Sequence, residues 1–202
     1  MILISVSFTI ALLMVRILYS GSIVYIFYPW NIALALLPLY FSRQLKKYAT
    51  LNFKTVLLIG GWLLFFPNAP YLVTDIFHFE ERLPVPQWFD LLLVVSAAWN
   101  GMLLCIISLR QVENFLSLFA KKSWLSIISV SFLILCGYGI YLGRYLRYNS
   151  WDIFTKPLTI LNTSLHHVWQ PLQYHSLWAF TFSFAAFLSL IYFTIKKMPG
   201  NQ

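Results

Sequence analysis

Residues 88–109 read WFDLLLVVSAAWNGMLLCIISL, a stretch of 22 residues with one charged side chain, Asp90. A helix needs about 20 mainly apolar residues to cross a bilayer, so this stretch predicts a transmembrane helix. Five further apolar runs lie at residues 2–19, 22–41, 55–73, 124–146 and 176–195. The sequence therefore predicts an all-α fold, a polytopic bundle of six transmembrane helices forming a single integral membrane domain over residues 1–202.

The composition agrees with a membrane protein and excludes an ordinary soluble domain. Of the residues, 60% are apolar and 10% are charged, against roughly 45–50% and about 25% in soluble domains. The chain carries 14 basic and 6 acidic residues, a net charge of +8. Because most of the basic residues lie between the apolar runs, we assign them to orienting the chain in the membrane, and we expect no nucleic-acid partner.

The lysines predict the orientation of the chain. Under the six-helix assignment, seven of the eight lysines fall on one side of the membrane. The positive-inside rule makes that side cytoplasmic. The first run lacks the positive region and the cleavage site of a signal peptide, so we expect an uncleaved first helix. The expected protein is a multi-pass protein of the cell membrane with both termini in the cytoplasm.

A proline-rich segment interrupts the third run. Its uninterrupted part, residues 56–66, covers only about 16 Å at 1.5 Å per residue, and Pro67-Asn68-Ala69-Pro70 follows. Broken backbone is tolerated in a membrane where it is buried in protein or lines a wet cavity. A helix that resumes after the break would carry four polar side chains on one face, at spacings of three, four and three: Asn68, Tyr71, Asp75 and His78. A simple helix end explains the segment equally well, and whether it is re-entrant stays open.

Two arginines lie on the predicted outer side, where the orientation rule gives no reason for them: Arg144 and Arg147. Charges near hydrocarbon are costly and usually paired, and candidate partners on that side are Asp75, Asp90 and Asp152. The cluster is either a structural ion-pair network or a ligand site, because both perturb charges in the same way. The predicted ligand-binding residues are Asn68, Tyr71, Asp75, His78, Asp90, Arg144, Arg147, Asn149 and Asp152.

Small residues and one amphipathic segment predict how the helices pack. Gly139 and Gly143, and likewise Ala97, Gly101 and Cys105, recur at a spacing of four and would let helices approach closely. Asn100, midway along its run, is predicted to hydrogen-bond between helices. The connection at 148–175 is too long for a turn. It contains leucines at helical spacing, which predicts an interfacial helix on the outer surface, anchored by Trp169.

Recognisable catalytic and cofactor motifs are missing from the sequence. It has no Gly-rich phosphate loop, no HExxH, no nucleophile elbow and no CxxC. Adjacent His166 and His167 would point in different directions on a helix and would not chelate one metal together. We therefore expect no cofactor and no metal, and whether the protein is an enzyme stays open.

Three segments of the chain are distinctive: FPNAPYLVTD at 66–75, WFD at 88–90 and GRYLRYNSWD at 143–152. They resemble signatures of a bacterial membrane family catalogued only as a domain of unknown function, numbered 1361. The resemblance implies a bacterial multi-pass membrane protein. It implies no catalytic residues, because the family name discloses no activity.

Three classes of function are consistent with these features. In the first, an outward-facing polar pocket binds or transports an anionic or lipid-linked ligand, with Arg144 and Arg147 holding a phosphate or carboxylate. In the second, a membrane-embedded enzyme acts on a lipid-linked substrate, with Asp75 or His78 as the acid or base. In the third, the chain is a non-catalytic subunit of a membrane complex. The expected partners are membrane lipids, an anionic lipid or small-molecule ligand, and a membrane-protein partner.

Overall fold

A computed structural model describes residues 1–80 and 82–198 of the chain. Its regular elements are helices, and no strand occurs in the described residues, so the all-α prediction is confirmed. The chain divides into two compact units, Met1–Leu118 and Phe119–Gln202. The single integral membrane domain stays a prediction about the chain in its bilayer.

Within the described residues, five helical segments are long and apolar enough to cross a membrane. They are Ile2–Ser20 (α1), Phe53–Phe77 (α3, α4 and most of η1), Gln87–Leu116 (α5), Lys122–Tyr145 (α6) and His175–Lys197 (α9). The predicted run 22–41 corresponds to α2, Tyr28–Leu45. Two prolines, Asn31 and Arg43 make α2 less apolar than the others, so six is an approximate count of spans.

The connection from α1 to α2 is longer than predicted. Gly21 ends α1 with a left-handed backbone, φ 65°, and its N–H donates to the carbonyl of Ile17 at 2.8 Å. Glycine adopts this conformation without steric cost. Helix α2 then begins at Tyr28 with Pro29 in its first turn, where the fixed φ of proline suits a helix start. Residues 22–27 are therefore a connection and not the beginning of a span.

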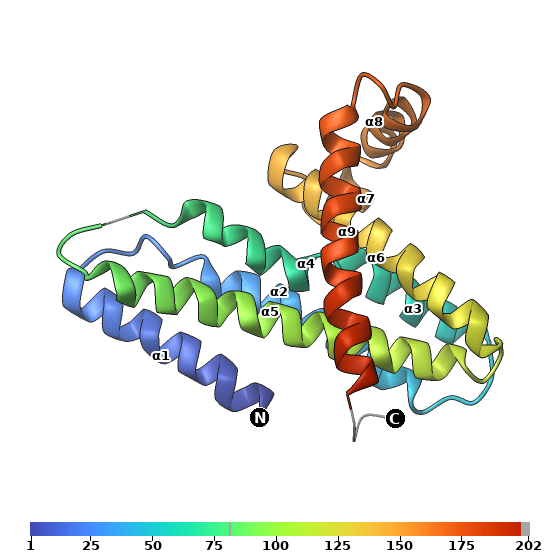
Figure 1. The fold of residues 1–202 in the computed structure, drawn as a ribbon, viewed down its shortest axis with the longest axis horizontal. Coiled ribbons are helices and arrows are strands. Elements are labelled where there is room, and N and C mark those ends of the chain that lie inside the picture. Colours follow the sequence, from blue (N-terminus) through green and yellow to red (C-terminus); the bar gives the residue numbers. More distant parts are fainter. Residues whose placement is uncertain (81, 199–202) are drawn as a thin grey trace. The chain divides into compact units, whose positions relative to one another are not determined.

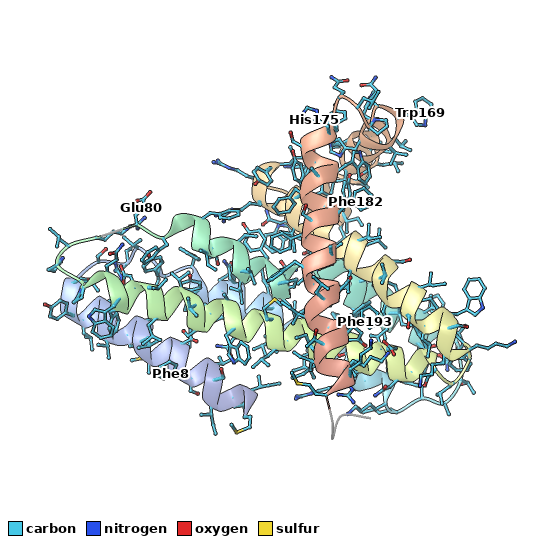
Figure 2. All side chains as sticks on the ribbon, viewed as in Figure 1. Phe8, Glu80, Trp169, His175, Phe182 and Phe193 are labelled. Atoms are coloured by element: carbon cyan, nitrogen blue, oxygen red, sulfur yellow. The ribbon has the colours of Figure 1, made fainter. Side chains whose placement is uncertain are left out.

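Helix α5 is the centre of unit 1 (Figure 1). Helices α1, α2, α4 and η1 all pack against it. In the most apolar 18-residue stretch of α5, 61% of the residues are buried, whereas the corresponding share in α1 is 17%. Helix α5 therefore forms the core of the unit and α1 lies at its periphery. Phe8 of α1, for example, is exposed (Figure 2). A Cβ at Gly101 would overlap the carbonyl oxygen of Ala69, so the predicted small-residue packing of this helix is confirmed.

The third run breaks where the prolines predict. Helix α3, Phe53–Phe65, starts with a capping box in which the Asn52 side chain accepts from the Thr55 N–H at 3.1 Å. After Phe66 and Pro67 the chain resumes as α4, Asn68–Tyr71, and as the 3-10 helix η1, Leu72–His78. Helix thus continues beyond the break, but as one short α-turn and a tighter 3-10 segment.

Unit 2 consists of α6, Lys122–Tyr145; α7, Asp152–Thr155; α8, Pro157–Trp169; and α9, His175–Lys197. Helices α6 and α9 pack together, and their close approach is at Gly137, where a Cβ would lie 2.6 Å from the Thr181 carbonyl oxygen. Gly137 was not among the glycines singled out from the sequence. Gly139 and Gly143 are half-buried, and their packing role stays a prediction.

Helix α8 confirms the amphipathic helix predicted in the long connection. Its leucines and the tryptophan at its end are exposed, with Leu158 73%, Leu165 48% and Trp169 83% accessible. Trp169 and His175 both lie at the α8–α9 connection (Figure 2). Placement of this helix in the outer membrane interface stays a prediction.

Candidate functional site

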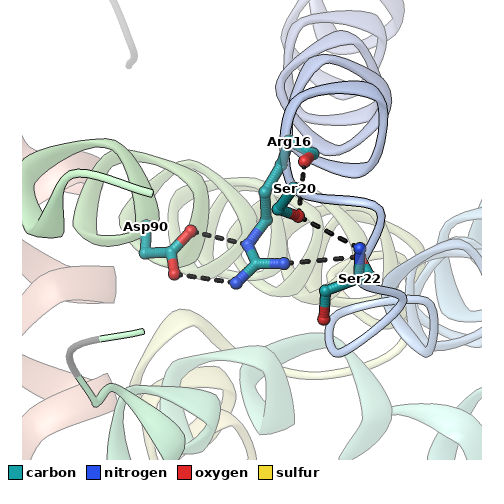
Figure 3. A network of polar contacts seen from close by, with 4 residues as sticks. All are labelled: Arg16, Ser20, Ser22 and Asp90. Carbon is teal, nitrogen blue, oxygen red and sulfur yellow. Dashed lines mark hydrogen bonds and ion pairs between the residues drawn. The ribbon is translucent and has the colours of Figure 1, made fainter. Parts of the chain in front are cut away.

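Asp90, one of the predicted ligand residues, forms an ion pair with Arg16 of α1 (Figure 3). The Arg16 Nε donates to Asp90 Oδ1 at 2.7 Å, and its Nη2 donates to Oδ2 at 3.0 Å. Both side chains are about 1% exposed. This pairing differs from the expected one, in which Asp90 would neutralise Arg144 or Arg147. Asp90 ties α5 to α1.

The end of α1 shapes the surroundings of Arg16. The Ser20 hydroxyl donates to the Arg16 carbonyl at 2.8 Å and accepts from the Ser22 N–H at 3.2 Å. The turn brings the Ser22 carbonyl within 3.4 Å of Arg16 Nη1 (Figure 3). Arg16 was missed from the sequence. The available signal was a single arginine inside an apolar run, which requires a partner because buried charge is costly.

Tyr25 covers the Arg16–Asp90 pair. Its ring centroid lies 4.8 Å from Arg16 Cζ and 5.6 Å from Arg82 Cζ, and the residue is 1% exposed. Burial, and next the Asp90 carboxylate, raise the pKa of the Tyr25 phenol, so it stays protonated. Arg82 in turn pairs with the exposed Glu80 at 3.2 Å. This end of unit 1 is therefore a polar cluster, buried at Arg16, Asp90 and Tyr25 and exposed at Glu80.

A second polar layer joins α1 to α5 deeper in the unit. Asn100 Nδ2 donates to Thr9 Oγ1 at 2.8 Å, and the Thr9 hydroxyl donates to Ser96 Oγ at 3.0 Å. Asn100 and Thr9 are almost fully buried. The interhelical hydrogen bond predicted for Asn100 is confirmed.

The structure does not keep the predicted polar face after the proline break. In a 3-10 helix, residues three apart eclipse one another, so Asp75 lies on the face of Leu72 and not on that of Tyr71. Asp75 is 2% exposed and Leu72 is fully buried, whereas Tyr71 is half-buried. The prediction that Asp75 shares one helical face with Tyr71 is therefore wrong, because it assumed α-helical geometry for residues that form a 3-10 helix.

Two other residues of the predicted stripe have distinct positions. Asn68 Nδ2 donates to the carbonyl of Phe65 at 3.0 Å, so the amide satisfies backbone next to the break. The backbone of His78 belongs to η1, but its side chain lies outside the described residues. Asn68 thus has a structural contact, and any role of either residue in ligand binding stays a prediction.

Arg147 in unit 2 has an unusual backbone. It follows the end of α6 with φ 58°, and it is the only non-glycine residue with positive φ in the described part of the chain. The next residue, Tyr148, donates its N–H to the Leu142 carbonyl at 3.1 Å, which closes the helix end. The Arg147 side chain is exposed, and no hydrogen bond or ion pair engages it among the described residues of unit 2. Arg144, one turn earlier, is half-buried and has a partner.

Asp152 stabilises the turn that follows Arg147. Its Oδ2 accepts from the Asn149 N–H at 2.7 Å, and its Oδ1 accepts from the Thr155 hydroxyl at 3.2 Å. The Asn149 backbone hydrogen bond is the main cause that lowers the pKa of Asp152. The predicted pairing of Asp152 with Arg147 is replaced by this local capping, which leaves Arg147 uncompensated within unit 2.

A cluster of aromatic and polar side chains docks α8 on the rest of unit 2. The Tyr138 hydroxyl lies 2.9 Å from Ser164 Oγ and 3.0 Å from His167 Nδ1. The Trp178 indole donates to the His167 carbonyl at 3.1 Å. His167 is 4% exposed, and burial, with His166 as a smaller cause, lowers its pKa. From the sequence, His167 was considered only as a metal ligand and was not paired with Tyr138.

Residues 30–191 match the sequence model of a family described as "Protein of unknown function (DUF1361)". The matched range covers most of the 202 residues. The chain belongs to this family. No curated protein and no solved structure matches it.

In this DUF1361 protein every predicted ligand-binding residue lies inside the matched range. Arg16, which was not among the predicted residues, lies outside it. The partner of Asp90 is thus supplied by α1, which precedes the range. Five predicted residues belong to unit 1, namely Asn68, Tyr71, Asp75, His78 and Asp90. Four belong to unit 2, namely Arg144, Arg147, Asn149 and Asp152. No cluster of three or more His, Cys, Asp or Glu that could hold a metal occurs in the part of the chain that the structure describes.

Proposed function

We propose that this DUF1361 protein is a multi-pass protein of the cell membrane that binds the anionic group of a lipid or lipid-linked molecule at its outer surface. Arg147 is the contact residue in this proposal. One observation carries it: an exposed arginine, unengaged within unit 2, stands in a left-handed backbone conformation at the end of a predicted span. The outward orientation follows from the lysine distribution.

The backbone of Arg147 supports a functional role because the conformation is costly. A left-handed conformation costs a non-glycine residue roughly 1–2 kcal/mol, and such residues cluster at functional sites. Glycine would remove the cost. The presence of arginine instead supplies a planar guanidinium, whose paired donors fit a phosphate or carboxylate.

The surroundings of Arg147 suit a ligand that sits at the membrane surface. The neighbouring Tyr148 hydroxyl lies 3.5 Å from Thr163 Oγ1 on α8. Helix α8 exposes leucines on one side, a pattern typical of helices that lie in the headgroup region. With α8 in that position, Arg147 would be at the depth of lipid phosphates, where a guanidinium meets anionic groups.

The proposal is tested by lipid binding to purified Arg147→Gln protein. We expect dioleoyl phosphatidylglycerol, measured by native mass spectrometry, to bind the variant about 10- to 100-fold more weakly than wild type, because hydrogen bonds to charged groups contribute roughly 1.5–3 kcal/mol. The matched control is Arg82→Gln, which removes an arginine that pairs with Glu80 in unit 1. Equal losses in the two variants would show attraction by net charge and contradict a site at Arg147.

A further inference from the structure

A hollow of about 280 Å³ lies at the end of unit 1 where α2 and α5 finish. It is lined from α2 and the turn after it by Leu45, Lys46 and Tyr48, and from α5 by Gln111, Asn114 and Phe115. The lysine distribution assigns this end to the cytoplasm. It is therefore separate from the Arg147 site, which belongs to unit 2 and to the outer surface.

The walls of the hollow combine an apolar floor with hydrogen-bond donors. Leu45 is fully buried and Phe115 is 5% exposed, whereas Lys46 is exposed. The Ser42 hydroxyl donates to Gln111 Oε1 at 2.9 Å, which leaves the amide N–H groups of Gln111 to donate elsewhere. The lining residues include no carboxylate. A lysine and an amide donor beside an apolar floor suit a phosphate group that is attached to an apolar molecule.

The ends of two helices add the opposite electrostatic preference. The last turns of α2 and α5 finish at the hollow, and their C-caps are Lys46 and Ser117. A helix C-terminus carries partial negative charge and attracts cations. The hollow thus pairs one full positive charge with two partial negative ends, a pattern that complements a headgroup with both a phosphate and an ammonium.

The size and the rim of the hollow point to a headgroup rather than to a large soluble ligand. Pockets for drug-sized ligands measure roughly 300–1,000 Å³, so about 280 Å³ is at the small end. Leu118, which also lines the hollow, is 59% exposed and offers an apolar surface to a lipid chain. Both features favour a small polar group that enters from a bilayer.

We propose that this hollow binds the phosphoethanolamine headgroup of a membrane lipid. Lys46 and Gln111 contact the phosphate, the final turns of α2 and α5 attract the ammonium, and Leu118 packs against the lipid chain. The site goes beyond the function proposed for Arg147, because it uses other residues and a zwitterionic ligand.

The test compares lipids that differ by single features, on protein carrying Arg147→Gln so that the outer site does not contribute. Dioleoyl phosphatidylethanolamine, phosphatidylcholine and phosphatidylglycerol are titrated, and binding is read by native mass spectrometry. We expect phosphatidylethanolamine to bind most tightly, and Lys46→Gln to weaken it about tenfold. Lys47→Gln removes a neighbouring exposed lysine that does not line the hollow and should change binding less than twofold.

Three results would overturn the proposal. Tightest binding of phosphatidylglycerol, with equal losses in Lys46→Gln and Lys47→Gln, would show attraction by net charge alone. Equal binding of phosphatidylethanolamine and phosphatidylcholine would remove the ammonium contact. Soluble phosphoethanolamine binding as tightly as the lipid would make the ligand a free phosphate ester. Gln111→Leu is a second variant, and unchanged binding of phosphatidylethanolamine to it would contradict the contact between Gln111 and the phosphate.

Discussion

The buried pair of Arg16 and Asp90 gives a sharp prediction about stability. Because both side chains are about 1% exposed, removing one partner leaves the other charge buried. Breaking a buried pair in this way costs roughly 3–5 kcal/mol. In proteins of 150–250 residues, 1 kcal/mol shifts the melting temperature by about 2–4 °C. Arg16→Leu and Asp90→Leu should therefore each lower the melting temperature by about 6–20 °C.

The double variant and an exposed pair supply the controls. Replacing both charges by leucine removes the unpaired group, so Arg16→Leu/Asp90→Leu should be more stable than either single variant. The exposed Arg82–Glu80 pair has side-chain exposures of 29% and 73%. Exposed pairs contribute about 0–1 kcal/mol, so Arg82→Gln should have little effect. Intrinsic-fluorescence melting in detergent measures all four variants. The structural role of the Arg16–Asp90 pair would be refuted if Arg16→Leu and Asp90→Leu were each as stable as Arg82→Gln. It would also be refuted if the double variant lost as much stability as the two single variants added together.

Three further predictions concern docking, packing and orientation. The pKa of His167 is lowered in the folded chain, so its neutral form stabilises the docking of α8 above about pH 6.5, the ordinary histidine pKa. This stability should be lost as the pH falls from there toward the folded pKa. The protection of α8 amides against hydrogen exchange, relative to the unfolded chain at each pH between 7.5 and 5, measures it, and in a His167→Gln variant this protection should vary less with pH. Gly101→Val should destabilise unit 1 by more than about 1 kcal/mol because its Cβ would overlap the Ala69 carbonyl, and unchanged melting would contradict that contact. On intact cells, a membrane-impermeant label should react with a cysteine at position 156 and not with a cysteine at position 46. The reverse pattern would show that the predicted orientation is inverted.

The long apolar helices could be predicted because their length and composition are properties of the sequence itself. Runs such as 88–109 are long, apolar and almost uncharged, and α5 and its counterparts appear where these runs lie. The break at Pro67 and the amphipathic α8 were also predictable, since proline chemistry and helical periodicity are local properties. The late start of α2 was not predicted, because the connection at 22–27 is apolar and differs from a helix only in its Gly21 and Pro29 boundaries.

The partners of the charges could not be predicted, because they depend on tertiary contacts. Asp90 was grouped with outer arginines by its side of the membrane, yet its partner is Arg16, 74 residues away in the chain. Asp152 was grouped in the same way, yet a local backbone N–H satisfies it. α-Helical spacing predicted Asp75 on the same face as Tyr71, but in the 3-10 helix η1 it lies on the face of Leu72. Sequence spacing thus located the charged side chains but did not determine which of them are neutralised.

The most direct test of the central proposal is the replacement of Arg147 by glycine. Glycine relieves the left-handed conformation, φ 58°, so Arg147→Gly should melt higher than wild type without lipid, by about 2–8 °C for a gain of roughly 1–2 kcal/mol. If the guanidinium holds an anionic headgroup, dioleoyl phosphatidylglycerol should raise the melting temperature of wild type and fail to raise that of Arg147→Gly. A variant that is more stable and still gains the full lipid-induced shift would contradict the role of Arg147.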